Sequence, residues 1–309
     1  MKLFLYHLVA FLVVAIWGST FVFTKLLLLN GFTPAQIFTL RFFIAYVLLS
    51  AYEMLFRRKK HRTNPDSLKD WLMFVGLGIT GGSLYFLSEN EALNYTTTTN
   101  VSLIVCCCPL AAALLIGMFY KSQRVSMRQM VGMMVAVCGV AAVILNGHFV
   151  LHLSPLGDAL ALTANLCWAV YSLLIISANK KYDAMFVTRK VFFYGLITML
   201  PYFWWRSEEL PTFMGGTFDV GLLLQPKILA NLMFLSVVAS CLCFLLWTWV
   251  MDKLGAMVAT NYVYVNPITT IIVAWLVLNE QITAYFVVGA ILILVGMYLA
   301  DKKSVKKST

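Results

Sequence analysis

Long apolar runs, separated by short polar or basic segments, extend through the whole chain. The runs are continuous, as in Leu8 to Ile16 and Val287 to Val295, whereas strands of a membrane barrel alternate apolar and polar residues. A helix needs about 20 mostly apolar residues to cross the hydrocarbon core of a bilayer. A helix also satisfies its own backbone hydrogen bonds there. The pattern therefore predicts an all-α integral membrane protein.

Ten segments between helix breakers have the character of membrane-spanning helices. They are approximately Leu3 to Leu29, Pro34 to Phe56, Trp71 to Asn90, Thr97 to Tyr120, Met127 to Asn146, Leu156 to Ser177, Val187 to Trp205, Ile228 to Met251, Ala256 to Asn279, and Thr283 to Ala300. The first segment continues without a clear small-x-small cleavage site, so we expect a retained helix and not a signal peptide.

Composition and charge agree with a chain embedded in lipid. Of its residues 61% are hydrophobic and 12% are charged, against about 25% charged in an average soluble domain. The net charge of +10 comes from short basic clusters beside apolar runs, which is typical of cytoplasmic loops and not of a nucleic-acid-binding protein. With the N-terminus inside, nineteen of the 23 lysines and arginines fall on the cytoplasmic side. We expect a multi-pass protein of the cell (inner or plasma) membrane with both termini cytoplasmic.

The two halves of the chain, residues 1–150 and 151–309, resemble each other weakly. The matched positions are Trp17 with Trp168, Pro109 with Pro267, Gly132 with Gly289, and Gly139 with Gly296. Five helices per half is an odd number, so the second half is expected to be inverted relative to the first. Inverted repeats around a central site are a recurring plan of secondary transporters.

The same residues resemble a known family. The signature consists of Trp17-Gly18-Ser19-Thr20-Phe21 followed by Lys25, then Arg41-Phe42, Ala92-Leu93-Asn94-Tyr95-Thr96, the two prolines, and Glu280 followed by Gly289 and Gly296. The chain is similar over its whole length to EamA-type members of the drug/metabolite transporter superfamily. The resemblance implies a ten-helix inverted-repeat carrier that exports amino acids or other metabolites, by facilitated or proton-linked transport. The halves have diverged, because no glycine follows Trp168 and the second half lacks a counterpart of Lys25.

Three charged residues inside predicted helices are candidate transport residues, because intramembrane charges are costly and usually functional. Lys25 is either a cation facing a central cavity or a side chain that reaches the outer interface. Arg41 is expected to pair within the bundle or to contact substrate. Glu89 is either a proton carrier in a partly dry cleft or a partner of one of these cations.

Proline breaks and polar residues mark a candidate substrate path. Pro109 and Pro267 interrupt the fourth and ninth helices, and a proline frees a backbone carbonyl that is tolerated beside a wet cavity or protein. Simple bending for packing is the alternative. The ninth helix also carries Asn261, Tyr262 and Asn266, which we expect to form a cavity wall. Trp17, Trp168 and Tyr171 are candidates to line it as well.

Other functions of the same architecture remain open in the sequence. A flippase of lipids or lipid carriers and a channel fit the helix count. A membrane-embedded enzyme fits less well, since the four histidines lie at ends and loops without a metal-ligand spacing. The seven cysteines lie in apolar runs and show neither a disulfide framework nor a metal site, so no cofactor or metal is expected. The glycine pairs predict close helix packing, or alternatively a homodimer contact.

Overall fold

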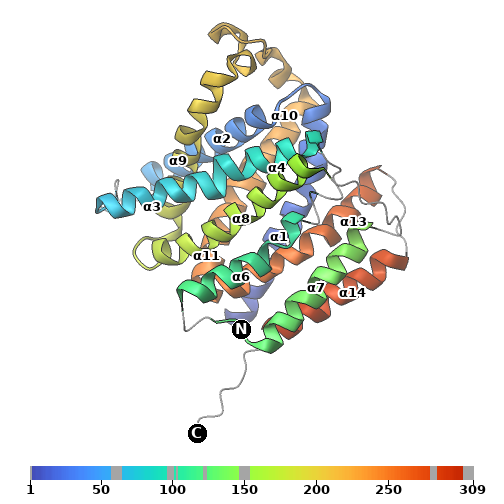
Figure 1. The fold of residues 1–309 in the computed structure, drawn as a ribbon. Helices are drawn as coiled ribbons and strands as arrows, with labels where there is room; N and C mark the ends of the chain where they lie inside the picture. Colours follow the sequence, from blue (N-terminus) through green and yellow to red (C-terminus); the bar gives the residue numbers. More distant parts are fainter. Residues whose placement is uncertain are drawn as a thin grey trace.

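The computed structural model describes residues 2–56, 65–95, 101, 104–120, 124–145, 154–278 and 284–301, which form a helical bundle (Figure 1). Within these ranges the only β-pairing is an isolated bridge between Pro211 and Phe218. The basic cluster predicted after Phe56, residues 57–64, and the tail 302–309 lie outside the described residues, as does Glu280.

Most predicted spans begin and end close to the expected positions. The α-helices are α1 (Lys2–Leu29), α2 (Pro34–Phe56), α3 (Leu68–Gly78), α4 (Leu84–Tyr95), α6 (Cys108–Phe119), α7 (Met127–Leu145), α8 (Pro155–Asn179), α9 (Ala184–Trp205), α10 (Pro226–Met233), α11 (Cys243–Leu254), α12 (Ala256–Asn261), α13 (Asn266–Leu278) and α14 (Ala284–Asp301).

Seven helical stretches in the described part of the chain are long and apolar enough to cross a membrane. Two shorter apolar helices, Ile104–Phe119 and Ala284–Ala300, accompany them. Helix α9 has 22 residues and carries Arg189 and Lys190 near its start. The protein is therefore an all-α, multi-pass membrane protein, as the apolar pattern predicts.

The predicted third and eighth helices are not continuous. The third consists of α3 and α4 joined by the π-helical segment η1 (Ile79–Ser83), in which Gly82 leaves the helical region at φ −136° and ψ −107°. The eighth consists of α10 and α11 joined by the π-helical segment η6 (Phe234–Leu242). Short π segments inside α-helices widen the backbone and are frequent at functional sites.

The predicted fourth and ninth helices break at their prolines. Pro109 lies in the first turn of α6, where a missing N–H costs nothing, and Cys107 before it forms a turn. Before α13, which begins at Asn266 with Pro267 next, the 3₁₀ segment η7 (Tyr262–Val265) follows α12. Both expected interruptions are therefore present.

Helices α7 and α14 pack against each other along their lengths (green and red in Figure 1). A methyl group on Gly139 would lie 2.7 Å from the Gly289 carbonyl oxygen, and one on Gly296 would lie 2.4 Å from the Ala136 nitrogen. Glycine therefore lets the two backbones touch, and the predicted packing role is confirmed. Because these faces are covered within the chain, a homodimer would use another surface.

The first helix of each predicted repeat packs among helices of the other repeat. Helix α1 contacts α11 and α13, whereas α8 contacts α3, α4 and α6 (Figure 1). The halves of the sequence are consequently interleaved in space and are not two separate lobes.

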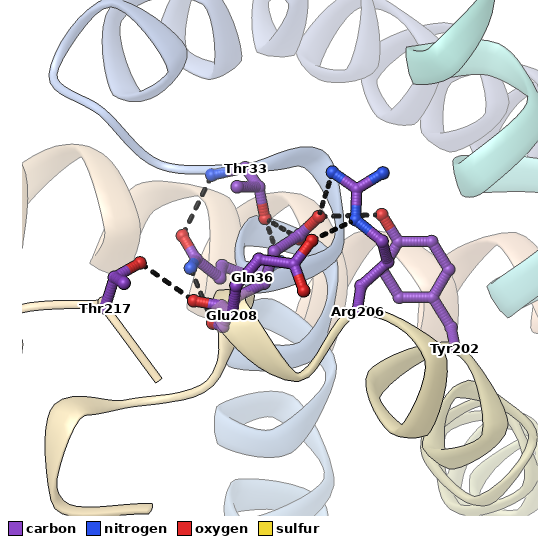
Figure 2. Close-up of polar contacts among 7 residues, drawn as sticks. Thr33, Gln36, Tyr202, Arg206, Glu208 and Thr217 are labelled. Atoms are coloured by element: carbon purple, nitrogen blue, oxygen red, sulfur yellow. Dashed lines mark hydrogen bonds and ion pairs between the residues drawn. The ribbon is translucent and has the colours of Figure 1, made fainter. Parts of the chain in front are cut away.

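The segment between α9 and α10 contains three short 3₁₀ turns: η3 (Ser207–Glu209), η4 (Thr212–Met214) and η5 (Val220–Leu224). Glu209 is buried and accepts hydrogen bonds from the hydroxyls of Thr33 at 2.5 Å and Tyr202 at 3.0 Å. The Gln36 side chain donates to the Glu209 carbonyl at 2.7 Å. Figure 2 shows this cluster, which ties the loop to the start of α2.

Candidate functional site

A cluster of tryptophans lies where the two predicted repeats meet. The ring centroid of Trp17 on α1 is 5.7 Å from that of Trp168 on α8 and 5.1 Å from that of Trp247 on α11. The indole N–H of Trp17 donates to the Ala239 carbonyl in η6 at 2.9 Å. Trp17 and Trp168, which are matched across the repeats, are therefore in aromatic contact. The π segment η6 supplies the carbonyl that orients the Trp17 indole.

Close approach of α1 to α13 places Trp17 in this cluster. A methyl group on Gly18 would lie 2.7 Å from the Asn266 carbonyl oxygen, so a larger residue would separate the helices. The hydroxyl of Thr270 donates to the Gly18 carbonyl at 2.8 Å. Asn266 therefore begins α13 at the point where α13 contacts α1.

Two opposite charges are buried beside the tryptophans. Arg41 on α2 is 4% exposed and Glu89 on α4 is 7% exposed. The Arg41 Nε donates to the Ser240 hydroxyl of η6 at 3.2 Å, and its guanidinium carbon lies 5.3 Å from the Phe86 ring centroid. The Arg41 side chain thus extends from α2 and contacts both α4 and η6.

Tyr85 links the buried carboxylate to the aromatic cluster. Its hydroxyl donates to Glu89 Oε1 at 2.9 Å, and its ring centroid lies 5.4 Å from that of Trp168. A buried charge is stable only when other polar groups compensate for its lost hydration. The cluster therefore holds a cation, a carboxylate and aromatic faces together.

Two indole donors in the cluster lack a hydrogen-bond partner among the described residues. They are the buried Nε1 atoms of Trp168 and Trp247, whose ring centroids are 6.2 Å apart. Buried polar groups are normally satisfied, and unsatisfied ones gather where a ligand or water binds. The arrangement can accept a small molecule that carries an anionic group and an apolar or aromatic part.

Comparisons with known proteins decide the family. The model of the EamA-like transporter family matches residues 4–145 and again residues 155–300. The chain belongs to this family. It is an EamA-type member of the drug/metabolite transporter superfamily and a small-molecule transporter of the membrane.

Relatives cover nearly the whole of this EamA-type transporter. An "Uncharacterized transporter" of Archaeoglobus fulgidus is 27% identical over 96% of this chain and 97% of its own. A "Probable amino-acid metabolite efflux pump" of Escherichia coli K12 is 26% identical over 94% and 92%. A solved crystal structure superposes with a TM-score of 0.74 over 96% of both chains at 17% identity, a likeness of fold. The family model and both of these named relatives are described as transporters or efflux pumps.

Several candidate residues of the EamA-type transporter converge on one place. The half-buried Trp17 and the buried Arg41, Glu89, Trp168 and Tyr171 belong to one cluster, in which the Tyr171 ring centroid is 5.3 Å from that of Trp168. Their convergence does not test whether they bind substrate, so that role stays a prediction.

The predicted wall on the ninth helix is divided. The Tyr262 hydroxyl is 2.7 Å from His7 Nδ1, and His7 lies ten residues before Trp17, about 15 Å along α1. Asn261 is buried at 3% exposure, and its Oδ1 has no hydrogen-bond partner among the described residues. Tyr262 is therefore positioned towards the amino end of α1, away from the tryptophans.

Lys25 lies on α1, but its side chain falls outside what the structure describes. Its predicted alternatives, a cavity cation or an interfacial anchor, stay predictions.

Three contributors to the site escaped the sequence analysis. Trp247 is fully buried in the cluster, and Tyr85 precedes Glu89 by one helical turn. Asn165 donates to the Ile104 carbonyl at 2.5 Å, just before the break at Pro109. Asn165 could have been noticed in the sequence, because it is a polar residue within an apolar run. In the described residues no group of three or more histidine, cysteine, aspartate or glutamate side chains could hold a metal ion.

Proposed function

We propose that the chain is a ten-helix carrier built from two inverted five-helix repeats, residues 1–150 and 151–309. Supporting it, the family model matches once in each half. The matched glycines Gly132 and Gly289 are 157 residues apart. The same spacing matches Gly81 in η1 with position 238 in η6, so the two π segments also correspond between the halves. The matched prolines both begin a helix after a break. Counting α9 with the nine apolar stretches gives ten spans.

The proposed substrate site is the buried cluster of Arg41, Glu89, Tyr85, Trp168 and Trp17. The single observation that carries the proposal is the burial of an arginine and a glutamate beside broken helices, at the contact between the repeats. Charges inside a membrane bundle mark substrate or ion pathways. The broken helices supply backbone groups where a transporter binds its cargo.

The proposed activity is export of amino acids or other small metabolites by alternating access, across the cell membrane, with both termini in the cytoplasm. A relative named as an amino-acid metabolite efflux pump supports this substrate range. An arginine and an anionic group of the cargo would pair, and the tryptophans would cover its apolar part. Because the repeats are interleaved, the moving units combine helices from both.

Glu89 is the proposed proton carrier. It is a buried carboxylate held by the Tyr85 hydroxyl, and it lies beside a fixed cation. Protonation would remove one of the two buried charges and so change the site's preference for a charged cargo. A carboxylate that alternates between protonated and ionised states couples transport to a pH gradient.

The test is transport by the purified protein in liposomes loaded with a mixture of labelled amino acids. We expect saturable efflux of a subset, accelerated by an imposed pH gradient. Glu89→Gln keeps the side-chain shape and should abolish the acceleration. Glu208→Gln, at an exposed carboxylate of the outer loop, is the matched control and should transport as wild type.

The outcomes separate the alternatives. Absence of movement for every soluble cargo, together with movement of labelled lipid between leaflets, would favour a flippase. Flux that rises linearly with concentration would favour a channel. An unchanged response to the pH gradient in Glu89→Gln would remove Glu89 as the proton carrier.

A further inference from the structure

Lys190 on α9 is surrounded by aromatic rings. Its ammonium lies 5.5 Å from the ring centroid of Phe186, 5.6 Å from that of Phe193 and 5.9 Å from that of Trp71 on α3. Such rings stabilise a cation without neutralising it. Lys190 lies six residues after the start of α9, about 9 Å along the helix.

Two neighbouring cations have carboxylate partners, whereas Lys190 has none among the described residues. Arg189 pairs with the buried Glu53 at the end of α2. Lys181 pairs with Asp70 at 2.5 Å and with Asp66 at 3.5 Å. Across the described ranges, no carboxylate lies within 4.0 Å of the Lys190 ammonium. The positive charge of Lys190 is therefore not neutralised by an ion pair within the described part of the chain.

The same face of α9 is lipid-facing. Phe193, Ile197, Leu200 and Trp204 follow Lys190 at helical spacing, and the last three are 46%, 60% and 91% exposed. On α3, Trp71 and Leu72 are also exposed. A lysine at one end of an exposed apolar stripe and a tryptophan at the other are residue types that membrane helices place near the interfaces.

Tyr194 packs under Trp71. Its side chain is 5% exposed, its ring centroid lies 6.0 Å from that of Trp71, and its hydroxyl is buried. The exposed surface formed by α3 and α9 therefore offers the Lys190 ammonium next to the Trp71 indole, which is 39% exposed. An ammonium beside an indole is suited to a phosphate at the membrane interface.

We infer that the exposed surface formed by α3 and α9 binds one anionic phospholipid, with its phosphate on Lys190 and its acyl chains along Ile197 and Leu200. The charge selects an anionic headgroup over a zwitterionic one. The exposed apolar stripe favours a lipid over free phosphate, because a free ion would leave that surface without a partner. In the predicted orientation the lipid belongs to the cytoplasmic leaflet. The inference needs only that α9 crosses the membrane, and it is independent of the transported cargo.

Native mass spectrometry of the full chain tests the inference. The protein is released from nanodiscs containing equal amounts of phosphatidylglycerol and phosphatidylcholine, and the retained lipids are counted. We expect wild type to retain phosphatidylglycerol about fivefold over phosphatidylcholine, from one lysine near the surface. Lys190→Gln should bring the ratio close to one, and Lys190→Arg should preserve it.

Lys253→Gln is the matched control, because Lys253 lies on the same predicted side but is paired with Asp252 at 2.7 Å. It should retain the wild-type ratio. Equal retention of the two lipids by wild type, or an unchanged ratio in Lys190→Gln, would overturn the inference. Loss of the preference on adding 10 mM inorganic phosphate, about the concentration of a phosphate buffer, would assign the site to a free anion. Trp71→Leu, expected to lower the ratio, provides a second variant if Lys190→Gln is not recovered folded.

Discussion

The contact between α7 and α14, here called the glycine seam, differs from the cluster around Trp17 in how its helices pack. In the seam, glycines bring backbone against backbone, and no charged side chain of the described residues lies between Gly139 and Gly289. In the cluster, large aromatic rings and two buried charges meet at broken helices, together with indole donors that have no partner in the described part of the chain.

The difference shows where the molecule is fixed and where it can respond to a ligand. Backbone contact at a glycine seam leaves no room for a second arrangement, since any added atom collides. The cluster contains indole donors that have no partner among the described residues, and it adjoins π segments whose hydrogen bonds are already irregular. Stability is therefore expected to depend most on the seam, and transport most on the cluster.

The largest expected effect is on the seam. In Gly289→Leu, the first added carbon would lie 2.6 Å from the Gly139 carbonyl oxygen. Overpacking of this kind costs about 3 kcal/mol or more, so we expect most of the protein to be lost from the monodisperse peak in fluorescence size-exclusion chromatography. Val288→Leu, at a neighbouring position that is 55% exposed, should behave as wild type. Normal yield and melting of Gly289→Leu would contradict the seam's role.

Arg41→Gln is expected to act mainly on transport. Removing one buried charge of a recognition pair costs about 2 kcal/mol or more, which corresponds to about 30-fold in kcat/KM. Arg206→Gln is the control, because Arg206 is half-exposed in the outer loop. Liposome transport assays on both variants provide the measurement. A transport loss equal in the two variants would show that burial at position 41 confers no special role.

Trp168→Phe should have a smaller effect on the same assay. The variant keeps an aromatic face but loses the indole donor and part of the contact with Trp17, so we expect KM to rise about fivefold. Trp204→Phe, at a side chain that is 91% exposed, should leave KM unchanged. A KM that stays constant in Trp168→Phe would place the cargo away from the tryptophans.

The smallest effect is expected at the ion pair between Lys181 and Asp70, which lies in neither region. The hydrogen bond to Asp70 raises the pKa of Lys181 above its usual value near 10.5. A raised lysine pKa adds stability below the unfolded pKa, and this stability is lost as pH rises through the folded pKa. Melting should therefore not vary through this pair between about pH 6 and pH 9. Lys181→Met should lower the midpoint by about 2 °C at most, because the Lys181 side chain is 44% exposed and solvent weakens the pair. A larger shift, or one that varies across this pH range, would contradict this weak contribution.

Much of the fold follows from the sequence because the lipid imposes simple requirements. The extent of the apolar runs predicted where α2 and α7 begin and end, and the prolines predicted both helix breaks. The π segments could not be predicted, because a one-residue shift in hydrogen bonding leaves no composition signal in a run such as Phe234–Leu242. The interleaving of α1 and α8 depends on contacts between distant segments and was equally invisible.

The candidate site was predictable to the extent that it contained charges or repeat partners. Arg41 and Glu89 stood out as ions in apolar runs, and Trp168 as the counterpart of Trp17. Trp247 did not, because tryptophan is common in membrane helices and nothing in the sequence separated it from Trp249 two residues later. Tyr262 was assigned to the site as one of the polar and aromatic residues of the ninth helix, and its hydroxyl lies 2.7 Å from His7 Nδ1, so its role in transport stays a prediction.

The interleaving also determines the order in which the molecule assembles during synthesis. Helix α1 is complete at Leu29, but α11 begins at Cys243, so more than 200 further residues must leave the ribosome before this partner exists. At ordinary translation rates that interval is about 10 to 40 seconds. During it the first helix resides in the bilayer with its glycine face against lipid. Assembly thus requires that α1 inserts into the bilayer on its own and associates with α11 later. An N-terminal fragment ending at residue 150 would lack the helices that complete the tryptophan cluster.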